Sequence, residues 1–545
     1  MIDSGIADPI SYFSNVVKKM NEQAGNSKDL QIGDASTSKN AGYFLVKAMF
    51  DLLNMDRTMN IVGSNYKCHY EFFDLFKTLC YAQMISPGSK LKAFERVIPN
   101  LYGVNEYSYD QILDFTSFIG ADYHKYIEVL NHHINEIWGR KTDKVYFDCT
   151  NYYFEIDLEN EFLRKGPSKE NQKAPLLGQA LLLDANQIPL DTEFYPGNES
   201  EKPLLRKRIE DMKNKNNICG KVIQVADKGL NCARNIYAAV MEAHDGYIFS
   251  KSIKGKSLTE EQKRWILESD DELNRWSSVT DNEGKVLYRY KTVKYRGKNN
   301  KVKDYGIYEY HCKLDENDTK ETHFTVKEKR IVTYNPTLAK KQKLEILKEL
   351  DKLKKLVSYK AAIHEDLGDV AKYLNIEAKD MNGKKVKIAT SINEDKLNDD
   401  LAFAGYNMII TSELDADPID IYKTYHNLWR IEESFRLLKT YLEARPVFVS
   451  NQSTIYGHFL ICYFSLTLIR LLELKIFNDE IPASHIFNFI RQYNITKNFD
   501  GSFINNATSS SYFYKIKEKL GLSKLGNVYL SKRDIDLLLK TEFDI

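Results

Sequence analysis

The feature that most constrains the fold is a change in the spacing of apolar residues near residue 140. From about 42 to 140, apolar residues recur at intervals of three and four, which is typical of amphipathic helices. From 144 to 253, short apolar runs bounded by turn residues alternate with helical patterns. Their order is three strands, a helix, a strand, a helix and a strand, which predicts a mixed α/β sheet after a helical N-terminal region.

The alternation of strands and helices stops after residue 255 and returns after 400. Runs rich in Tyr and Val between these points predict an antiparallel β region, followed by a charged helix at 338–357. A strand at 405–411 and a long helix at 418–443 come next, and the remaining residues look mostly helical. We therefore expect an α/β protein with a helical N-terminal domain (1–140), a mixed-sheet core in two parts (141–255 and 401–475), a β-rich insertion domain (256–400) and a helical C-terminal region (476–545).

Composition excludes several classes of protein. Lys and Arg number 77 and Asp and Glu number 76, so any affinity for polyanions must come from local patches of charge. The 7 cysteines form no CxxC pair, which argues against a disulfide framework and fits a reducing, cytoplasmic compartment. The longest apolar run, 459–469, is too short to cross a bilayer as a helix, and the first residues lack the pattern of a signal peptide, so we expect no membrane partner.

Two aspartates lie at the ends of apolar strands, where a charge is costly unless it faces a site. Asp148 ends the apolar part of KVYFDCT, and Asp227 follows VIQVA. A helix precedes the second strand, so the two strands can lie side by side, with ligands bound beyond their carboxyl ends. Alternatively, each aspartate begins a turn or caps the next helix, which is an equally common role for this residue.

A third acidic residue, Glu432, lies in the predicted long helix, which begins with Asp417 as N-cap and a proline at its first position. On a regular helix, Glu432 and Lys439 fall within the apolar stripe, and Arg430 falls outside it. Charged groups in a stripe that faces the core are paired or bound to something. The alternative is a buried Glu–Lys pair, although a separation of about 10 Å along the helix is long for a direct ion pair.

Two aspartates and a glutamate supply the oxygen ligands that Mg²⁺ or Mn²⁺ prefers. Two such ions can activate a water or hydroxyl nucleophile and stabilise the leaving oxygen during cleavage of a phosphodiester. If the fold gathers Asp148, Asp227 and Glu432, the sequence therefore predicts metal-dependent phosphoryl transfer.

Three segments in this order, VYFDCTNYYFE, VADKG and YHNLWRIEESFRLLK, resemble bacterial insertion-sequence transposases of the DDE superfamily. The third resembles the signature of the hairpin-forming branch, which is Tyr, two residues, Arg, three residues, Glu, six residues, Lys. Tyr425, Glu432 and Lys439 match this spacing, whereas the Arg position holds Leu428. The resemblance covers mainly 140–255 and 400–470.

The resemblance implies a ribonuclease H-like catalytic core with Asp148, Asp227 and Glu432 as catalytic ligands of Mg²⁺ (or Mn²⁺), with two ions. It also implies strand cleavage at the ends of an insertion sequence, a hairpin intermediate, and joining to target DNA. The partners would be double-stranded DNA, both terminal inverted repeats and target, bound by a homodimer in the cytoplasm at the nucleoid, with the N-terminal domain as a DNA-binding domain. Candidate DNA contacts in the third segment are Tyr425, Lys439, Arg430 and Arg436.

A second group of candidate DNA contacts lies in the predicted β region. Residues 285–303 contain eight Lys or Arg, interleaved with Tyr and without an acidic residue, which suits a hairpin that binds phosphates. Alternatively, this is a solvated edge hairpin protected by its lysines. The candidates are Arg289, Lys294, Arg296 and Lys298.

Two rival functions share the same expected core. Leu428 at the signature Arg position favours a repurposed transposase that binds DNA without cutting it. A stand-alone nuclease would cut DNA without strand transfer and would need no basic insertion. Nicking of DNA from the element's ends that depends on Mg²⁺ separates the first rival from a transposase, and strand transfer separates the second.

Overall fold

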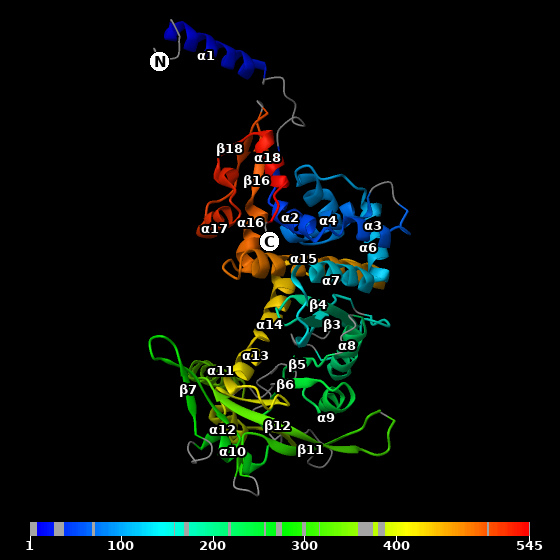
Figure 1. Cartoon of the computed structure of the whole chain (residues 1–545), viewed down its shortest axis with the longest axis vertical. Helices are drawn as coiled ribbons and strands as arrows, with labels where there is room; N and C mark the ends of the chain where they lie inside the picture. Colours follow the sequence, from blue (N-terminus) through cyan, green and yellow to red (C-terminus); the bar gives the residue numbers. More distant parts are fainter. Residues whose placement is uncertain are drawn as a thin grey trace. The chain divides into compact units, whose positions relative to one another are not determined.

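The computed structural model groups the chain into two compact units, residues 115–467 and residues 1–114 with 468–545 (Figure 1). The structure describes residues 8–26, 37–67, 71–156, 158–167, 174–215, 220–254, 258–268, 275–296, 301–315, 317–357, 374–379, 387–498 and 501–543.

The larger unit is built on a ten-stranded mixed sheet in the order β4-β3-β2-β5-β6-β15-β12-β8-β7, with β11 paired to β12. The pairs β2–β5 and β5–β6 are parallel, and the other pairs are antiparallel. The predicted mixed α/β class is therefore confirmed. The strands are β2 (Lys144–Tyr153), β3 (Leu176–Leu183), β4 (Pro189–Pro196), β5 (Ile223–Ala226), β6 (Gly246–Lys251), β7 (Ser277–Thr280), β8 (Val286–Thr292), β11 (Gly306–Cys312), β12 (Thr322–Tyr334) and β15 (Tyr406–Thr411).

Helices of this unit pack on the sheet and complete its core. The strand β3 is buried along its whole length, as expected for a strand covered on both faces. Side chains from β2, β5 and α8 form one apolar cluster that includes Val145, Phe147, Leu205 and Ala226. The helices of this unit are α7 (Tyr123–Trp138), α8 (Glu201–Lys215), α9 (Ala233–Tyr237), α10 (Glu260–Leu267), α11 (Pro336–Val357), α12 (Glu394–Ala402), α13 (Pro418–His426) and α14 (Trp429–Arg436), with most of α15 (Gln452–Leu471).

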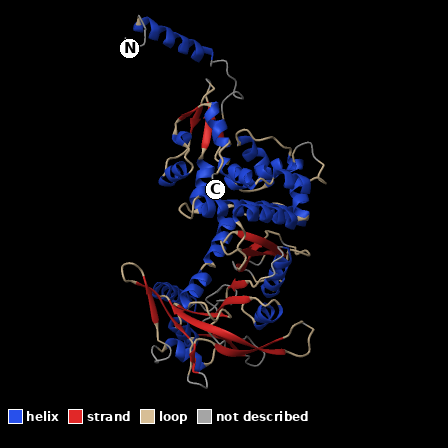
Figure 2. Ribbon diagram, in the orientation of Figure 1, coloured by secondary structure: helices blue, strands red, loops and turns tan. Residues whose placement is uncertain are grey.

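The predicted order of strands and helices from 144 to 253 is confirmed, as β2, β3, β4, α8, β5, α9 and β6. The antiparallel β region after residue 256 is confirmed too. β9 (Tyr295–Arg296) pairs with β10 (Val302–Lys303), and β13 (Leu374–Lys379) pairs with β14 (Lys387–Ile392), so that each pair forms a two-stranded sheet of its own. The other strands, β7, β8, β11 and β12, do not form a separate sheet. Instead β12 pairs with β15, and β8 and β7 extend the sheet that carries β2 and β5 (Figure 2). The limits of the five expected regions stay predictions.

The prediction of one continuous helix at 418–443 is wrong, because this helix is broken. The helix α13 ends at His426, α14 begins at Trp429, and a π-helical turn, η10 (Leu437–Tyr441), follows. The predicted start is confirmed, since Asp417 accepts a hydrogen bond from the backbone of Ile419 (2.7 Å) and Pro418 is the first helical residue.

The smaller unit brings N-terminal helices and C-terminal segments together. A sheet in the order β1-β16-β17-β18 joins them, and the buried Asn40 side chain donates a hydrogen bond to the carbonyl of Ile490 (2.8 Å). Its elements include α1 (Pro9–Asn26), β1 (Ser38–Asn40), α2 (Phe44–Leu53), α3 (Asp56–Val62), α4 (Phe72–Ile85), α16 (Ala483–Gln492), β16 (Asn494–Lys497), β17 (Phe503–Asn505), α17 (Ser511–Lys519), β18 (Tyr529–Leu530) and α18 (Lys532–Leu539).

The expectation of a mostly helical C-terminal region needs correction, because β16, β17 and β18 interrupt its helices. Strands of two to four residues are too short to show an alternation of apolar and polar side chains. The apolar run at 459–469 lies within α15 and is buried, as predicted. Among the described helices, none has both the length and the apolar character needed to cross a membrane.

Candidate active site

Two of the three predicted acidic residues lie at neighbouring positions of two parallel strands, with Asp148 inside β2 and Asp227 directly after β5. Phe147 of β2 is opposite Ala226 of β5, so Asp148 and Asp227 are the next residues along the two strands. The prediction that these strands lie side by side is therefore confirmed. The prediction that Asp148 ends its strand is wrong, since β2 continues to Tyr153, and Asp148 is a half-buried residue in the middle of the strand.

The face of β2 that carries Asp148 is covered by the segment that contains α13, α14 and α15. Side chains alternate between the faces of a strand, so Tyr146, Asp148 and Tyr152 share one face. Asn427 donates a hydrogen bond to the Tyr146 hydroxyl (3.4 Å), and the ring of Tyr152 lies 4.9 Å from that of Phe459. Asp148 accepts a hydrogen bond from the backbone N–H of Cys149 (2.8 Å) on Oδ1.

The third segment reaches Asp227 through Tyr425 of α13. The Tyr425 hydroxyl donates a hydrogen bond to Asp227 Oδ1 (3.0 Å), across 198 residues of sequence. Burial and the negative charge of Asp227 both raise the pKa of Tyr425, so the phenol stays protonated as a donor. Ser250 of β6 and Asn407 of β15 flank the same hydroxyl and hydrogen-bond each other (2.9 Å). Sequence reasoning missed these two polar residues, which lie within apolar strands.

Glu432 lies within electrostatic range of Asp227. Partial burial raises the pKa of Glu432, and the negative charge of Asp227 raises it further. Its carboxylate makes no hydrogen bond or ion pair with the described residues. A cation bound between these two carboxylates would offset the repulsion between them.

The predicted orientation of the helix carrying Glu432 is wrong. Glu432 is exposed, and it is Arg430 that is buried, with 6% of its surface exposed. Arg430 pairs with Glu433 (3.1 Å) and stacks on the Trp429 ring (4.1 Å). The reason is the break at Asn427 and Leu428, which changes the rotational phase that a continuous helix would keep from 418 onward. The alternative of a buried Glu432–Lys439 pair does not fit an exposed Glu432.

The other candidate DNA contacts of this segment differ in accessibility. Lys439 lies in the π-helical turn after α14, with its ammonium 5.4 Å from the centre of the Tyr152 ring. Arg436 is exposed and contacts Glu433 (3.3 Å). Arg430 is buried and paired with Glu433, so it does not present its guanidinium to solvent. Leu428, at the signature Arg position, is buried in the break between the helices.

Only some of the basic side chains at 285–303 are exposed to solvent. Arg289, Lys294 and Arg296 are exposed, and Lys298 lies outside the described residues. Lys291 is buried, with 2% of its surface exposed, and donates hydrogen bonds to the carbonyls of Trp265 (2.5 Å) and Glu268 (3.0 Å). β8 pairs on both sides, with β7 and β12, so this part of the segment is not an edge strand. The strands β9 and β10 of the same segment are exposed and pair only with each other among the described residues, which fits the alternative interpretation of a solvated hairpin.

A hollow of about 360 Å³ lies beside the loop that follows Asp227. It is lined by polar side chains, three glycines and Pro167, and one of the glycines, Gly229, is two residues after Asp227. Gly178 in its wall has no room for a larger residue, since a Cβ there would lie 2.2 Å from the Tyr195 ring. The lining includes Asn151, Gly178, Tyr195, Glu201, Lys202 and Gly229.

The acidic residues suit a divalent cation by their chemistry. In the part of the chain that the structure describes, no group of three or more His, Cys, Asp or Glu side chains has the spacing of a metal site. The fit to Mg²⁺ therefore rests on the donor set: hard carboxylate oxygens, with repulsion between Asp227 and Glu432 that a cation would offset.

Comparisons with known proteins give little further guidance. No family model matches the chain, and no curated protein matches it in sequence. Among solved structures, it is similar to a chain in the cryo-EM structure of the piggyBac transposase synaptic complex with hairpin DNA, at 10% identity and a TM-score of 0.26. The alignment covers 49% of this chain and 62% of that chain, which is less than two thirds of the neighbour's length. So distant a likeness carries no argument about the function of this chain.

Proposed function

We propose that this protein is a DNA transposase with a ribonuclease H-like core, which cleaves DNA strands in a metal-dependent reaction and transfers them to target DNA. The observation that supports this most is the meeting of two distant segments at one edge of the sheet. Tyr425 contacts Asp227, Glu432 interacts with the same aspartate, and Asp148 occupies the next position on the parallel neighbour strand. Carboxylates gathered from separate segments are suited to phosphoryl transfer.

Asp148, Asp227 and Glu432 would hold Mg²⁺ or Mn²⁺, and two bound ions would supply an activated nucleophile and charge neutralisation at the leaving oxygen. The protein's own groups do the remaining work. The Tyr425 hydroxyl fixes the orientation of the Asp227 carboxylate through its hydrogen bond. Arg436 and Lys439, about one and two turns after Glu432 in the same segment, would contact the phosphates of the strand end.

The partner would be double-stranded DNA, both the terminal inverted repeats of an insertion sequence and the target. Exposed Arg289, Lys294 and Arg296 would contact its backbone. Cleavage at both ends requires that the two ends be held together, so a homodimer on DNA is part of the proposal. The hairpin route belongs to it on the basis of the signature formed by Tyr425, Glu432 and Lys439.

The test uses a DNA fragment that carries the sequences flanking the gene. We expect the full chain to cut this DNA with Mg²⁺ and not with EDTA. Asp227→Asn should reduce the rate by about 1,000-fold or more, because a lost metal ligand removes several kcal/mol of transition-state stabilisation. Asp420→Asn is the matched control, since Asp420 is exposed in the first turn of α13, and it should cut at the wild-type rate.

The outcomes separate this proposal from its rivals. A folded Asp227→Asn protein that cuts normally would contradict the assignment of the acidic site. Tight binding of the flanking DNA without cleavage in Mg²⁺ or Mn²⁺ would identify a DNA-binding protein instead. Cleavage without joining to a target plasmid would identify a nuclease.

A further inference from the structure

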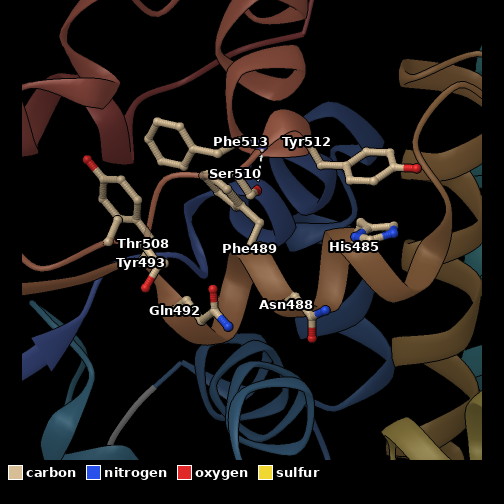
Figure 3. A pocket seen from close by; sticks show the side chains of 10 residues that line it. His485, Asn488, Phe489, Gln492, Tyr493, Thr508, Ser510, Tyr512 and Phe513 are labelled. Atoms are coloured by element: carbon tan, nitrogen blue, oxygen red, sulfur yellow. Dashed lines mark hydrogen bonds between the residues drawn. The ribbon is translucent and has the colours of Figure 1, made fainter.

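The smaller unit contains a cavity of about 210 Å³ that the acidic site does not involve. It lies between α16 and the segment that leads into α17 (Figure 3). This volume is below the roughly 300–1,000 Å³ of pockets for drug-sized ligands, so it suits one small planar group. Its lining consists of His485, Asn488, Phe489, Gln492, Tyr493, Ala507, Thr508, Ser510, Tyr512 and Phe513.

Aromatic rings form the inner surface of this cavity. Phe489, Tyr493 and Phe513 are buried, and the ring of Phe489 lies 5.6 Å from that of Tyr493 and 5.7 Å from that of Phe513. At one side, His485 and Tyr512 are stacked, with ring centres 3.6 Å apart and planes 19° apart. Flat rings at stacking distance are a surface on which a further flat ring can stack.

The rim of the cavity is polar without being charged. Asn488 and Gln492 are exposed one turn apart on α16, and their side-chain amides make no hydrogen bond within the described residues. An amide offers a donor and an acceptor together, which is the pattern that matches the edge of a nucleobase. A cation lies beside the stacked pair, since the Lys515 ammonium is 5.4 Å from the centre of the Tyr512 ring.

We propose that this cavity binds one unpaired nucleobase of a DNA strand. The base stacks against the aromatic surface, its edge meets the amides of Asn488 and Gln492, and Lys515 contacts the adjoining phosphate. The base must be unpaired because a base within a duplex is stacked and cannot enter a pocket. This inference rests on the proposed function only for the choice of DNA as the polymer.

The test is photocrosslinking of the full chain, in EDTA, to a single-stranded oligonucleotide in which thymidines are replaced by 5-iododeoxyuridine. Irradiation links an iodinated base to a ring that it contacts, and mass spectrometry of the peptides locates the link. We expect crosslinks at Tyr512, His485 or Phe489. An unmodified oligonucleotide in excess should suppress them.

Two variants and a control make the test specific. Asn488→Ala combined with Gln492→Ala, and separately Tyr512→Ala, should each reduce crosslinking and affinity for the oligonucleotide by roughly tenfold, the effect expected for one lost stacked base. Tyr514→Ala is the matched control, because Tyr514 is 57% exposed on the same helix and does not line the cavity. Its crosslinking should equal that of the wild type.

Crosslinks confined to other peptides, or unchanged in the Tyr512→Ala protein, would overturn the proposal, and so would an absence of crosslinks. These results are independent of the cleavage test, because no metal is present. Crosslinks in the cavity of a protein that never cleaves DNA would support the cavity and contradict the transposase. Cleavage without crosslinks in the cavity would support the transposase and contradict the proposed base-binding cavity.

Discussion

The buried carboxylate of Glu328 and the two carboxylates of Asp227 and Glu432 differ in how completely hydrogen bonds and ion pairs satisfy them. Glu328 of β12 is fully buried, and it accepts hydrogen bonds from Arg330 (2.6 Å), Tyr247 (2.6 Å) and Tyr310 (2.9 Å). Asp227 and Glu432, by contrast, repel each other, and Glu432 has no partner among the described residues. A buried charge with all its bonds made stabilises a fold, whereas like charges held together at a surface indicate a missing ligand.

The buried group joins parts of the sheet that come from distant segments. Tyr247 lies on β6, Tyr310 on β11, and Glu328 and Arg330 on β12, so their bonds connect the predicted insertion to the strand beside β5. Arg330 also stacks on the Tyr308 ring (3.3 Å). We infer that this cluster holds the insertion strands in register with the strands that carry the acidic site.

The largest effect should come from removing the buried carboxylate of Glu328. Glu328→Ala leaves the Arg330 charge and two hydroxyls buried without their acceptor, so we expect a loss of about 3–5 kcal/mol in the free energy of unfolding. Urea unfolding followed by tryptophan fluorescence measures it, because all 4 tryptophans lie in the larger unit.

A control for this variant is Glu309→Ala, at an exposed position of β11, which should change the unfolding free energy by at most about 0.5 kcal/mol. A loss below about 1 kcal/mol for Glu328→Ala would show that the buried cluster does not hold the sheet together. The contrast between the two groups of carboxylates would then fail.

An intermediate effect should come from adding Mg²⁺, the cation that we propose Asp227 and Glu432 bind. We expect saturating Mg²⁺ to stabilise the wild type by about 1–3 kcal/mol, as binding to the folded state alone requires. Asp227→Asn and Glu432→Gln should lose most of this gain, and Glu309→Ala should keep it. The measurement is the same unfolding experiment with and without Mg²⁺ at matched ionic strength.

An equal gain in the wild type and in Asp227→Asn would mean that Mg²⁺ acts elsewhere on the protein. If Mg²⁺ does not stabilise the wild type either, Asp227 and Glu432 do not bind the ion in the absence of DNA. Either result would remove the distinction between a structural and a functional group of carboxylates.

The sequence predicted the parts of this architecture that depend on local patterns. The α/β order from 144 to 253 and the neighbouring positions of Asp148 and Asp227 follow from short apolar runs and the rules of strand connection. The orientation of Glu432 could not be predicted, because a break at Asn427 and Leu428 carries no proline or glycine. The burial of Glu328 and Lys291 could not be predicted either, since charged residues that alternate with other residues along a strand normally face solvent.

The smallest effect concerns the charge on Glu432 without metal. Its pKa is raised by burial and by Asp227, so the ionised form is less favourable in the folded state than in the unfolded one. The associated stability is present below the ordinary pKa of 4.5 and is lost as pH rises through the higher pKa of the folded state. At neutral pH, Glu432→Gln should therefore be more stable than the wild type, by at most about 0.5 kcal/mol because the group is exposed.

This small gain should disappear as pH falls below 4.5, where the glutamate is protonated in both states. Unfolding experiments in EDTA at several pH values measure it. Glu432→Gln that is less stable than the wild type at neutral pH would mean that Glu432 makes a favourable contact in the metal-free fold. It would then resemble Glu328, and the repulsion from which we infer a cation site would not exist.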